Sequence, residues 1–338
     1  MTDHDPTCGD TSVAALTLEE IRRARTLLGA RIHTTPVRAL DHPMLRDLIG
    51  PATSVLLKLE LLQVTGSFKA RAALLNVDHL TPDQHARGVT AISAGNHAIA
   101  VAYAARAAGT TAKLVMTASA NRLRVETCRQ YGAELVIAPT MHDGFEVVRS
   151  IEREEGRTLL HPFEGREIAI ATATLGLELC EQVTDLEAVI VPIGGGGLCA
   201  GVASAVKLLS PRCRVYGVEP AGADSMFRSL AAGRPVGIPS VETIADSLGA
   251  PRAMPISFEF CRRHVDEIVR VSDDALRRGM RMLLETAKLA VEPAAAAAFA
   301  AAVGPLRRQV EGRRLALILC GSNIDAESFA RLVAANDR

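Results

Sequence analysis

The segment from Leu62 to Ala73, LQVTGSFKARAA, carries the residue with the clearest chemical potential, which is Lys69. An apolar run at Val55–Leu59 predicts a strand before it, and Phe68–Val77 has helical spacing with Ser67 as its N-cap. Lys69 then falls in the first helical turn, where the positive end of the helix dipole disfavours a charged amine. A neutral lysine amine forms a Schiff base with a carbonyl. Taken alone, the same segment also fits an ordinary surface lysine.

Four consecutive glycines form a loop between a predicted strand at Val189–Ile193 and a predicted helix at Leu198–Leu209. They are Gly194, Gly195, Gly196 and Gly197. Glycines at such a turn let an anion approach the N–H groups of the helix start, so this loop is a candidate phosphate site. It is not a Walker loop, because no Gly-Lys-Ser/Thr follows it.

The glycine loop also fits a second kind of site, the dinucleotide-binding fingerprint. Gly195, Gly197 and Ala200 match the pattern G-x-G-x-x-A at a strand-to-helix turn. Glu219 ends the next strand, where an acidic residue binds the ribose in that fingerprint. Taken alone, this loop does not separate a dinucleotide from another phosphorylated cofactor.

Two further loops follow predicted strands. The first, Ser93-Ala94-Gly95-Asn96-His97, opens a predicted helix at Ala98–Ala108, and its N–H groups and amide side chain suit a carboxylate ligand. His97 also fits a structural histidine. The second loop begins at Cys320, directly after the strand at Leu315–Leu319. Its thiol suits core packing or a weak hydrogen bond to a ring nitrogen.

The elements that must position these loops alternate between apolar runs and amphipathic stretches of helical period. The predicted strands are Val55–Leu59, Val89–Ile92, Ala112–Met116, Leu135–Ile137, Val189–Ile193, Val215–Val218, Ile268–Val271 and Leu315–Leu319. This alternation predicts an α/β fold with a mostly parallel sheet and helices on both of its faces. Ligands in such folds bind in the loops after the carboxyl ends of the strands.

Local signals mark several other segments. Thr17 to Glu20 has the spacing of a capping box and predicts a helix toward Leu28. The alanine-rich stretch Ala294–Ala302, preceded by Pro293, predicts a buried helix. Residues 1–15 are expected to be disordered.

The composition excludes several classes of protein. The chain has 338 residues, with 38 Lys plus Arg balanced by 38 Asp plus Glu, so no basic surplus favours nucleic acid or an anionic membrane. Seven scattered cysteines without a CxxC pair indicate reduced thiols in a cytoplasmic protein rather than a disulfide framework or zinc site. The acidic N-terminus is no signal peptide, and no apolar run is long enough to span a bilayer, which predicts a soluble protein.

A lysine loop, a carboxylate loop and a phosphate loop, in this order, resemble the fold-type-II pyridoxal-phosphate enzymes, and most closely the threonine/serine dehydratases and serine racemases. The shared motifs are Gly66-Ser67-Phe68-Lys69, Ser93-Ala94-Gly95-Asn96-His97-Ala98, Tyr131-Gly132-Ala133-Glu134, His161-Pro162-Phe163, Gly194 to Leu198, Gly217-Val218-Glu219-Pro220, Ile244-Ala245-Asp246 and Gly321-Ser322-Asn323. They cover nearly the whole chain, so the resemblance implies two open, mostly parallel sheets flanked by helices, the architecture of the tryptophan synthase β-like enzymes. A nicotinamide enzyme has no use for the lysine loop, so the resemblance disfavours the dinucleotide alternative.

The resemblance implies roles for these residues. Lys69 would bind pyridoxal 5′-phosphate as an imine and move the substrate's α-proton, with Phe68 packed beside the ring. The other cofactor contacts would be Asn96 at the ring hydroxyl, Gly194, Gly195, Gly196, Gly197 and Leu198 at the phosphate, and Cys320 at the ring nitrogen. The substrate would be held by Ser67, Ser93, Ala94, Gly95, Asn96 and His97.

The implied reaction converts a β-hydroxy amino acid to a 2-oxo acid and ammonia by way of an aminoacrylate. A thiol such as that of Cys320 does not stably protonate the ring nitrogen, which favours prompt loss of the β-hydroxyl over transamination. Racemases of this family typically carry a serine before Gly-Asn-His as an acid on the opposite face. Ala94 has no proton to give there. We therefore favour a dehydratase over a racemase of the serine racemase type.

Several positions depart from the family pattern. These are Ile99 in place of Gln, Ala171 to Thr174 in place of a Gly-Gln-Gly-Thr-like segment, Ala72 after Arg71 in place of Gly, and Ser247 in place of Gly. They leave threonine, serine and a hydroxyaspartate-like amino acid as candidate substrates. They also leave a non-catalytic protein that binds the cofactor or an amino acid as an alternative.

The resemblance also implies features beyond the reaction. Glu219, Ala223 and Ser225 fall at a divalent-cation site of the racemase branch, for Mg²⁺ or Ca²⁺, although a serine replaces its second carboxylate. We expect a homodimer, with residues 65–161 as a small mobile domain and residues 1–64 and 162–338 as a large cofactor-binding domain. The chain ends soon after Asn323, so we expect no separate regulatory domain.

Overall fold

The computed structural model describes residues 13–334, so the predicted disorder of residues 1–15 falls largely outside the described part. Each of the eight predicted strands is present within two residues of its predicted bounds. Two short strands, β1 and β6, add to them. The strands are β1 Val37–Ala39, β2 Ser54–Lys58, β3 Val89–Ile92, β4 Ala112–Thr117, β5 Glu134–Ala138, β6 Thr158–Leu159, β7 Ala188–Pro192, β8 Arg214–Pro220, β9 Glu267–Val271 and β10 Arg314–Ile318.

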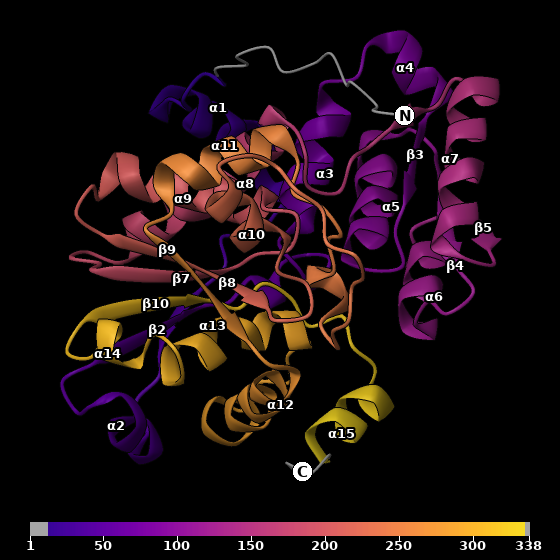
Figure 1. Cartoon of the computed structure of the whole chain (residues 1–338). Helices are drawn as coiled ribbons and strands as arrows, with labels where there is room; N and C mark the ends of the chain where they lie inside the picture. The colour runs from indigo at the N-terminus through magenta and orange to yellow at the C-terminus, as the bar shows by residue number, and fades with distance from the viewer. Residues whose placement is uncertain (1–12, 335–338) are drawn as a thin grey trace.

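The strands form two separate sheets, as the resemblance to the fold-type-II enzymes implies. The six-stranded sheet has the order β1-β2-β10-β7-β8-β9, and the four-stranded sheet has the order β5-β4-β3-β6. Only the edge strand β1 runs antiparallel to its neighbour, with Val37 opposite Lys58, and the other pairs are parallel. Figure 1 shows the smaller sheet with α5, α6 and α7 on the right and the larger sheet on the left.

Helices cover both sheets. Those in the first half of the chain are α1 Leu18–Leu28, α2 Pro43–Ile49, α3 Lys69–Asp78, α4 Pro82–Arg87, α5 Asn96–Ala108, α6 Arg122–Gln130, α7 Met141–Glu155 and α8 Arg166–Gln182. Those in the second half are α9 Gly197–Leu209, α10 Ser225–Ala232, α11 Pro255–His264, α12 Asp273–Met282, α13 Pro293–Val303, α14 Arg307–Val310 and α15 Ala326–Ala334. Short helical turns are η1 Gly29–Arg31, η2 Glu60–Leu62, η3 Asp246–Leu248 and the π-helical η4 Leu283–Ala287.

The local helix signals are confirmed at two sites. Thr17 caps α1, and Glu20 completes a capping box by accepting from the Thr17 backbone N–H. The alanine-rich helix α13 begins at Pro293 and is buried along Pro293–Ala302, against β7, β8, β9 and β10. Its small side chains let the helix axis lie close to the sheet, so the low complexity of this stretch reflects core packing.

One local prediction is wrong. The N-cap of α3 is Phe68 rather than Ser67, and no side chain caps this helix. Ser67 stays extended because it forms an isolated β-bridge with Gly321, and the Phe68 N–H donates to the Cys320 carbonyl at 3.1 Å. This long-range pairing overrides the capping preference of a serine.

Parallel pairing brings three of the predicted loops to one edge. β10 pairs with β2 on one side and with β7 on the other, all in parallel. The chain segments that follow these strands lead to Lys69, Cys320 and the four glycines. Because carboxyl ends of parallel strands meet at one edge, the three segments converge. The Ser93 loop follows β3 of the other sheet, so the convergence lies where the two sheets face each other.

Candidate active site

Lys69 is the first residue of α3, as its place after the glycine-containing turn predicts. Its ammonium Nζ donates to the Pro162 carbonyl and lies 5.0 Å from the centroid of the Phe68 ring. Burial lowers the pKa of Lys69 from 10.5 to about 8, while Cys320 and Glu292 act in the opposite direction. At neutral pH an amine with this pKa is neutral often enough to act as a nucleophile.

The glycine loop ends β7 and leads into α9, whose N-cap is Gly196 at φ +96° with no side-chain cap. A Cβ on Gly195 would lie 2.2 Å from the Phe163 ring, and a Cβ on Gly197 would lie 2.5 Å from the Phe163 carbonyl oxygen. Larger residues are therefore excluded here by close packing. An uncapped helix start with such a loop suits an anion such as phosphate.

The segment Pro162–Phe163 joins the lysine to the glycine loop. Pro162 accepts the hydrogen bond from Lys69, and Phe163 packs against Gly195 and Gly197. His161 stabilises this turn, because its Nδ1 accepts from the Glu164 N–H at 2.8 Å. Burial lowers the pKa of His161 to about 4, so the imidazole is neutral at pH 7.

The Ser93 loop forms the uncapped N-terminus of α5, with Gly95 as N-cap. Ser93 accepts from the Gly95 N–H at 3.1 Å, which shapes the turn, and the methyl group of Ala94 is partly exposed. His97 points away into the protein, where its Nε2 lies 2.8 Å from the Leu160 carbonyl. Burial lowers the pKa of His97 to about 3, so its side chain serves structure, and only its backbone belongs to the loop.

Asn96 connects this loop to the other side of the site. Its Nδ2 donates to Glu292 Oε1 at 2.7 Å, and its Oδ1 accepts from Asn323 Nδ2 at 2.7 Å. Asn323 also donates to the Thr65 carbonyl at 2.8 Å, just before the lysine motif. The amide of Asn96 is thereby fixed between residues that are far apart in sequence.

Cys320 lies at the end of β10, almost fully buried, and it contributes to the electrostatic surroundings of Lys69. Burial raises the pKa of the Cys320 thiol well above 9, so the group stays protonated and neutral at physiological pH. A neutral thiol is a weak hydrogen-bond donor rather than a proton source.

Two residues of the site, Glu292 and Arg124, were not predicted from the sequence. Glu292 is the N-cap residue of α13 and is 1% exposed. Arg124 comes from α6, with its Nε donating to the Asn323 carbonyl at 2.8 Å and its Nη1 paired with Asp246. Neither residue belongs to a local motif. Each reaches the site by contacting a residue that lies about two hundred positions away in the sequence.

The departures from the family pattern occupy different places. Ser247 lies at the site, with its Oγ 3.4 Å from Asn96 Nδ2. Thr172 of the Ala171–Thr174 segment lies behind the glycine loop and donates to the Gly197 carbonyl at 2.8 Å. Ile99 and Ala72 are both buried in the core. Only Ser247 among them is therefore placed to affect a ligand.

Comparison with known proteins identifies the family. Residues 30–321 match the family of pyridoxal-phosphate dependent enzymes. The chain belongs to this family. A phenylserine dehydratase of Ralstonia pickettii is 52% identical over 93% of this chain and 95% of that protein. An L-threonine ammonia-lyase of Thermotoga maritima is 35% identical over 94% of this chain and 78% of that protein. The structure of maize serine racemase has a TM-score of 0.88 at 33% identity, covering 94% of this chain and 97% of that one.

The donor set of this pyridoxal-phosphate enzyme fits its cofactor. It combines a lysine of lowered pKa, a glycine-lined helix start and a neutral thiol. In addition, two buried side-chain oxygens at the site, Ser67 Oγ and Glu292 Oε2, have no hydrogen-bond partner within the protein. Buried polar atoms of this kind are rare and point to a ligand.

The residues of the predicted cation site lie together but do not fit a divalent ion. Both carboxylate oxygens of Glu219 accept backbone N–H bonds, from Met226 at 2.9 Å and Phe227 at 2.7 Å. The Ser225 hydroxyl is buried and unpaired in the structure. Within residues 13–334 no group of three His, Cys, Asp or Glu side chains is arranged to hold a metal. A divalent cation is therefore not supported.

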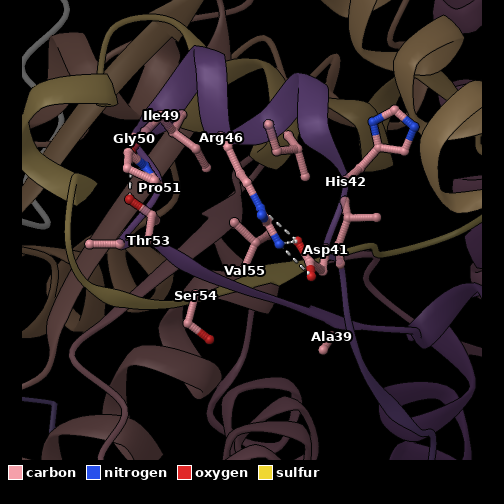
Figure 2. A pocket seen from close by; sticks show the side chains of 13 residues that line it. Ala39, Asp41, His42, Arg46, Ile49, Gly50, Pro51, Thr53, Ser54 and Val55 are labelled. Atoms are coloured by element: carbon pink, nitrogen blue, oxygen red, sulfur yellow. Dashed lines mark hydrogen bonds and ion pairs between the residues drawn. The ribbon is translucent and has the colours of Figure 1, made fainter.

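A separate pocket of about 320 Å³ lies between α2 and β2 (Figure 2). Figure 2 shows Arg46 of α2 directed toward Asp41, and the two are joined by hydrogen bonds of 2.9 Å. The pocket reaches Ser54, at the amino end of β2, whereas Lys69 follows the carboxyl end. It is thus at the opposite edge of the sheet from the active site.

Proposed function

We propose that this enzyme converts a β-hydroxy amino acid to a 2-oxo acid and ammonia, as a dehydratase. The observation that carries the proposal is the convergence of Lys69 with the glycine loop, Cys320 and the uncapped start of α5. In the net reaction the β-hydroxyl and the α-proton leave as water, and water then releases the nitrogen as ammonia. The names of the similar dehydratase and ammonia-lyase support this reaction class.

Pyridoxal phosphate, when bound, supplies an electron-withdrawing ring that stabilises negative charge at the substrate's α-carbon. Lys69 would hold it covalently, and afterwards its amine would accept the α-proton. Gly194 to Leu198 would bind the phosphate through N–H groups, and Asn96 and Cys320 would orient the ring with Phe68 beside it. The start of α5, from Ser93 to His97, would bind the substrate carboxylate, near Ser67.

We propose 3-phenylserine as the first substrate to test. A cleft of about 650 Å³ adjoins Ala94, and its walls combine the apolar side chains of Ala120, Pro139 and Met141 with polar side chains, among them Thr117 and Asn121. This cleft has room for an aromatic group on the β-carbon. The proposal also rests on the 52% identity with a phenylserine dehydratase.

A substrate panel tests both proposals. Purified enzyme with added cofactor would be incubated with 3-phenylserine, threonine, serine and 3-hydroxyaspartate, each as separate stereoisomers. Release of ammonia and of the 2-oxo acid would be measured. The expected result is the highest kcat/KM for a phenylserine isomer. Ammonia release from none of these compounds would exclude the dehydratase and favour a non-catalytic binding protein, and a higher kcat/KM for threonine would exclude the aryl preference alone.

Ala94 separates the dehydratase from the racemase alternative. Its methyl group has no acidic proton, so position 94 supplies no acid to the substrate. Ala94→Ser is expected to introduce measurable racemisation of serine, with the ratio of racemisation to ammonia release rising at least about tenfold. Chiral chromatography of the remaining serine measures it. Faster racemisation than ammonia release by the unaltered enzyme would instead make it a racemase.

Gly195→Ala tests the phosphate-binding loop. The new methyl group would meet the Phe163 ring at 2.2 Å, so either the ring or the loop must move. The expected result is a cofactor Kd raised about tenfold or more, because overpacking of this kind costs about 1–3 kcal/mol. Fluorescence titration with pyridoxal phosphate measures it. Gly237→Ala is the matched control, since its Cβ would have only ordinary contacts from 3.4 Å outward; equal affinities of both variants would contradict the assigned role.

We also propose a homodimer, and a small domain of residues 65–161 that closes over the substrate. The four-stranded sheet falls within this range, and Arg124 of α6 contacts Asp246 and Asn323 of the rest of the chain. Closure would exclude water from the reacting substrate.

We place the enzyme in the cytoplasm because its cysteines, free throughout residues 13–334, suit a reducing compartment. No helix in this part of the chain has the length and apolarity that crossing a bilayer requires. Light scattering of the holoenzyme measures the oligomeric state.

A further inference from the structure

Glu292 is a buried carboxyl group that the proposed reaction leaves without a role. It is 1% exposed, and one of its oxygens, Oε2, has no hydrogen-bond partner. The nearest cationic group is Arg124, whose Nη2 lies 3.7 Å from Oε2, beyond hydrogen-bond distance. A buried carboxyl with a free oxygen is costly for the fold, so its presence at a ligand site requires an explanation.

The other oxygen of Glu292 fixes the orientation of Asn96. Asn96 Nδ2 donates to Glu292 Oε1, and Asn323 Nδ2 donates to Asn96 Oδ1, each at 2.7 Å. The orientation of the Asn96 amide is fixed, because Asn323 Nδ2 also donates to the Thr65 carbonyl and so presents a donor to Asn96 Oδ1, which leaves Asn96 Nδ2 facing Glu292. Glu292 also crowds Gly321, where a Cβ would lie 2.9 Å from Oε1. Glu292 is therefore held through its side chain by Asn96 and through its backbone by Gly321, whose carbonyl accepts from the Glu292 N–H at 3.3 Å.

Charged and titratable groups face Glu292 from several elements. They are Arg124 of α6, Asp246 of η3, Lys69 of α3 and Cys320 at the end of β10. Burial dominates over these neighbours and raises the pKa of Glu292 from 4.5 to about 7. Arg124 acts to lower this pKa and Asp246 acts to raise it. The carboxyl group therefore exchanges its proton near neutral pH.

We propose that Glu292 is a positioning residue of the active site, whose carboxyl group holds the Asn96 amide toward the cofactor. This inference rests on the proposed cofactor site. It is carried by the two amide bonds, the free Oε2 and the full burial of the carboxyl group, none of which depends on a sequence motif. Glu292 acts through Asn96 and not on the substrate itself.

Two substitutions separate the hydrogen bond from the charge. Glu292→Gln keeps an oxygen that accepts from Asn96 and removes the titration, whereas Glu292→Ala removes both. Fluorescence titration with pyridoxal phosphate is expected to give a Kd within about threefold of the unaltered protein for Glu292→Gln, and about tenfold weaker for Glu292→Ala. Equal affinity of all three proteins would overturn the positioning role. Melting temperatures confirm that each variant is folded.

A pH titration of the holoenzyme tests the same role with a second readout. The visible absorbance of the bound cofactor is expected to change with a midpoint near 7 in the unaltered enzyme, and this transition is expected to be absent in Glu292→Gln. The matched control is Glu219→Gln, which removes another buried carboxyl whose pKa burial raises, to about 8, and which does not contact Asn96. It is expected to keep the transition near 7. A transition unchanged in Glu292→Gln would overturn the inference. Failure of the unaltered protein to bind the cofactor through Lys69 would instead overturn the proposed function.

Discussion

Replacing Lys69 with alanine is expected to abolish covalent attachment of pyridoxal phosphate and to lower kcat by about a thousandfold or more. The side chain supplies the only lysine amine that the structure places beside the glycine loop, through Pro162 and Phe163. Because burial lowers its pKa to about 8, about a tenth of the amine is neutral at pH 7. An ordinary lysine, with a pKa of 10.5, would be almost wholly charged at that pH.

Three measurements check this prediction. Absorbance of the holoenzyme in the visible range reports the covalent bond, mass spectrometry after borohydride reduction locates it, and ammonia release reports activity. Lys113→Ala is the matched control, since Lys113 lies on β4 and pairs with Glu134 and Glu155 outside the site. We expect this control to retain bound cofactor and activity. A Lys69→Ala protein that still bound cofactor covalently would show that another amine is the attachment site.

The strands and the site loops could be predicted because both depend on local patterns. Short apolar runs ended by Gly, Pro or Ser specify where a buried strand stops, and the functional loops start there. β1, of three residues, and β6, of two, escaped prediction because strands this short carry no periodic signal. The N-cap of α3 was predicted at Ser67, and the cause of the error is non-local, since Gly321 pairs with Ser67 across the sheet edge.

Glu292 and Arg124 show where prediction from the sequence ends. Glu292 precedes Pro293 and reads locally as a helix start, and Arg124 lies in a helix rich in charged residues. Nothing local indicates that one carboxyl and one guanidinium meet Asn96 and Asn323. The sequence contains one weak signal for Glu292, which is its place directly before an apolar helix. An acidic residue there is either a solvent-exposed helix cap or a buried functional group. The fold decides between these two, through the burial of α13.

The buried ion network around Arg71 is a second feature that no motif indicates. Arg71 is fully buried in α3, two residues from the proposed catalytic lysine. It pairs with Glu60 at 2.8 Å and with Glu178 of α8 at 2.8 Å, and Lys58 of β2 pairs with the same Glu178 at 3.0 Å. The network links the start of α3 to β2 and α8, so it stabilises the position of the helix that carries Lys69.

Replacing Arg71 with leucine is expected to lower the free energy of unfolding by about 3–5 kcal/mol, because Glu60 and Glu178 lose their shared partner inside the protein. Urea unfolding followed by circular dichroism measures this change. Arg46→Leu is the matched control, since the Arg46–Asp41 pair is exposed, at 59% and 72%, and pairs of this kind contribute about 1 kcal/mol or less. A loss for Arg71→Leu no larger than for this control would contradict the prediction. Replacing Arg71 and Glu60 together with apolar residues is expected to recover part of the loss, because Glu60 is then no longer an unpaired charge and Glu178 keeps its ion pairs with Lys58 and Arg25, each at 3.0 Å.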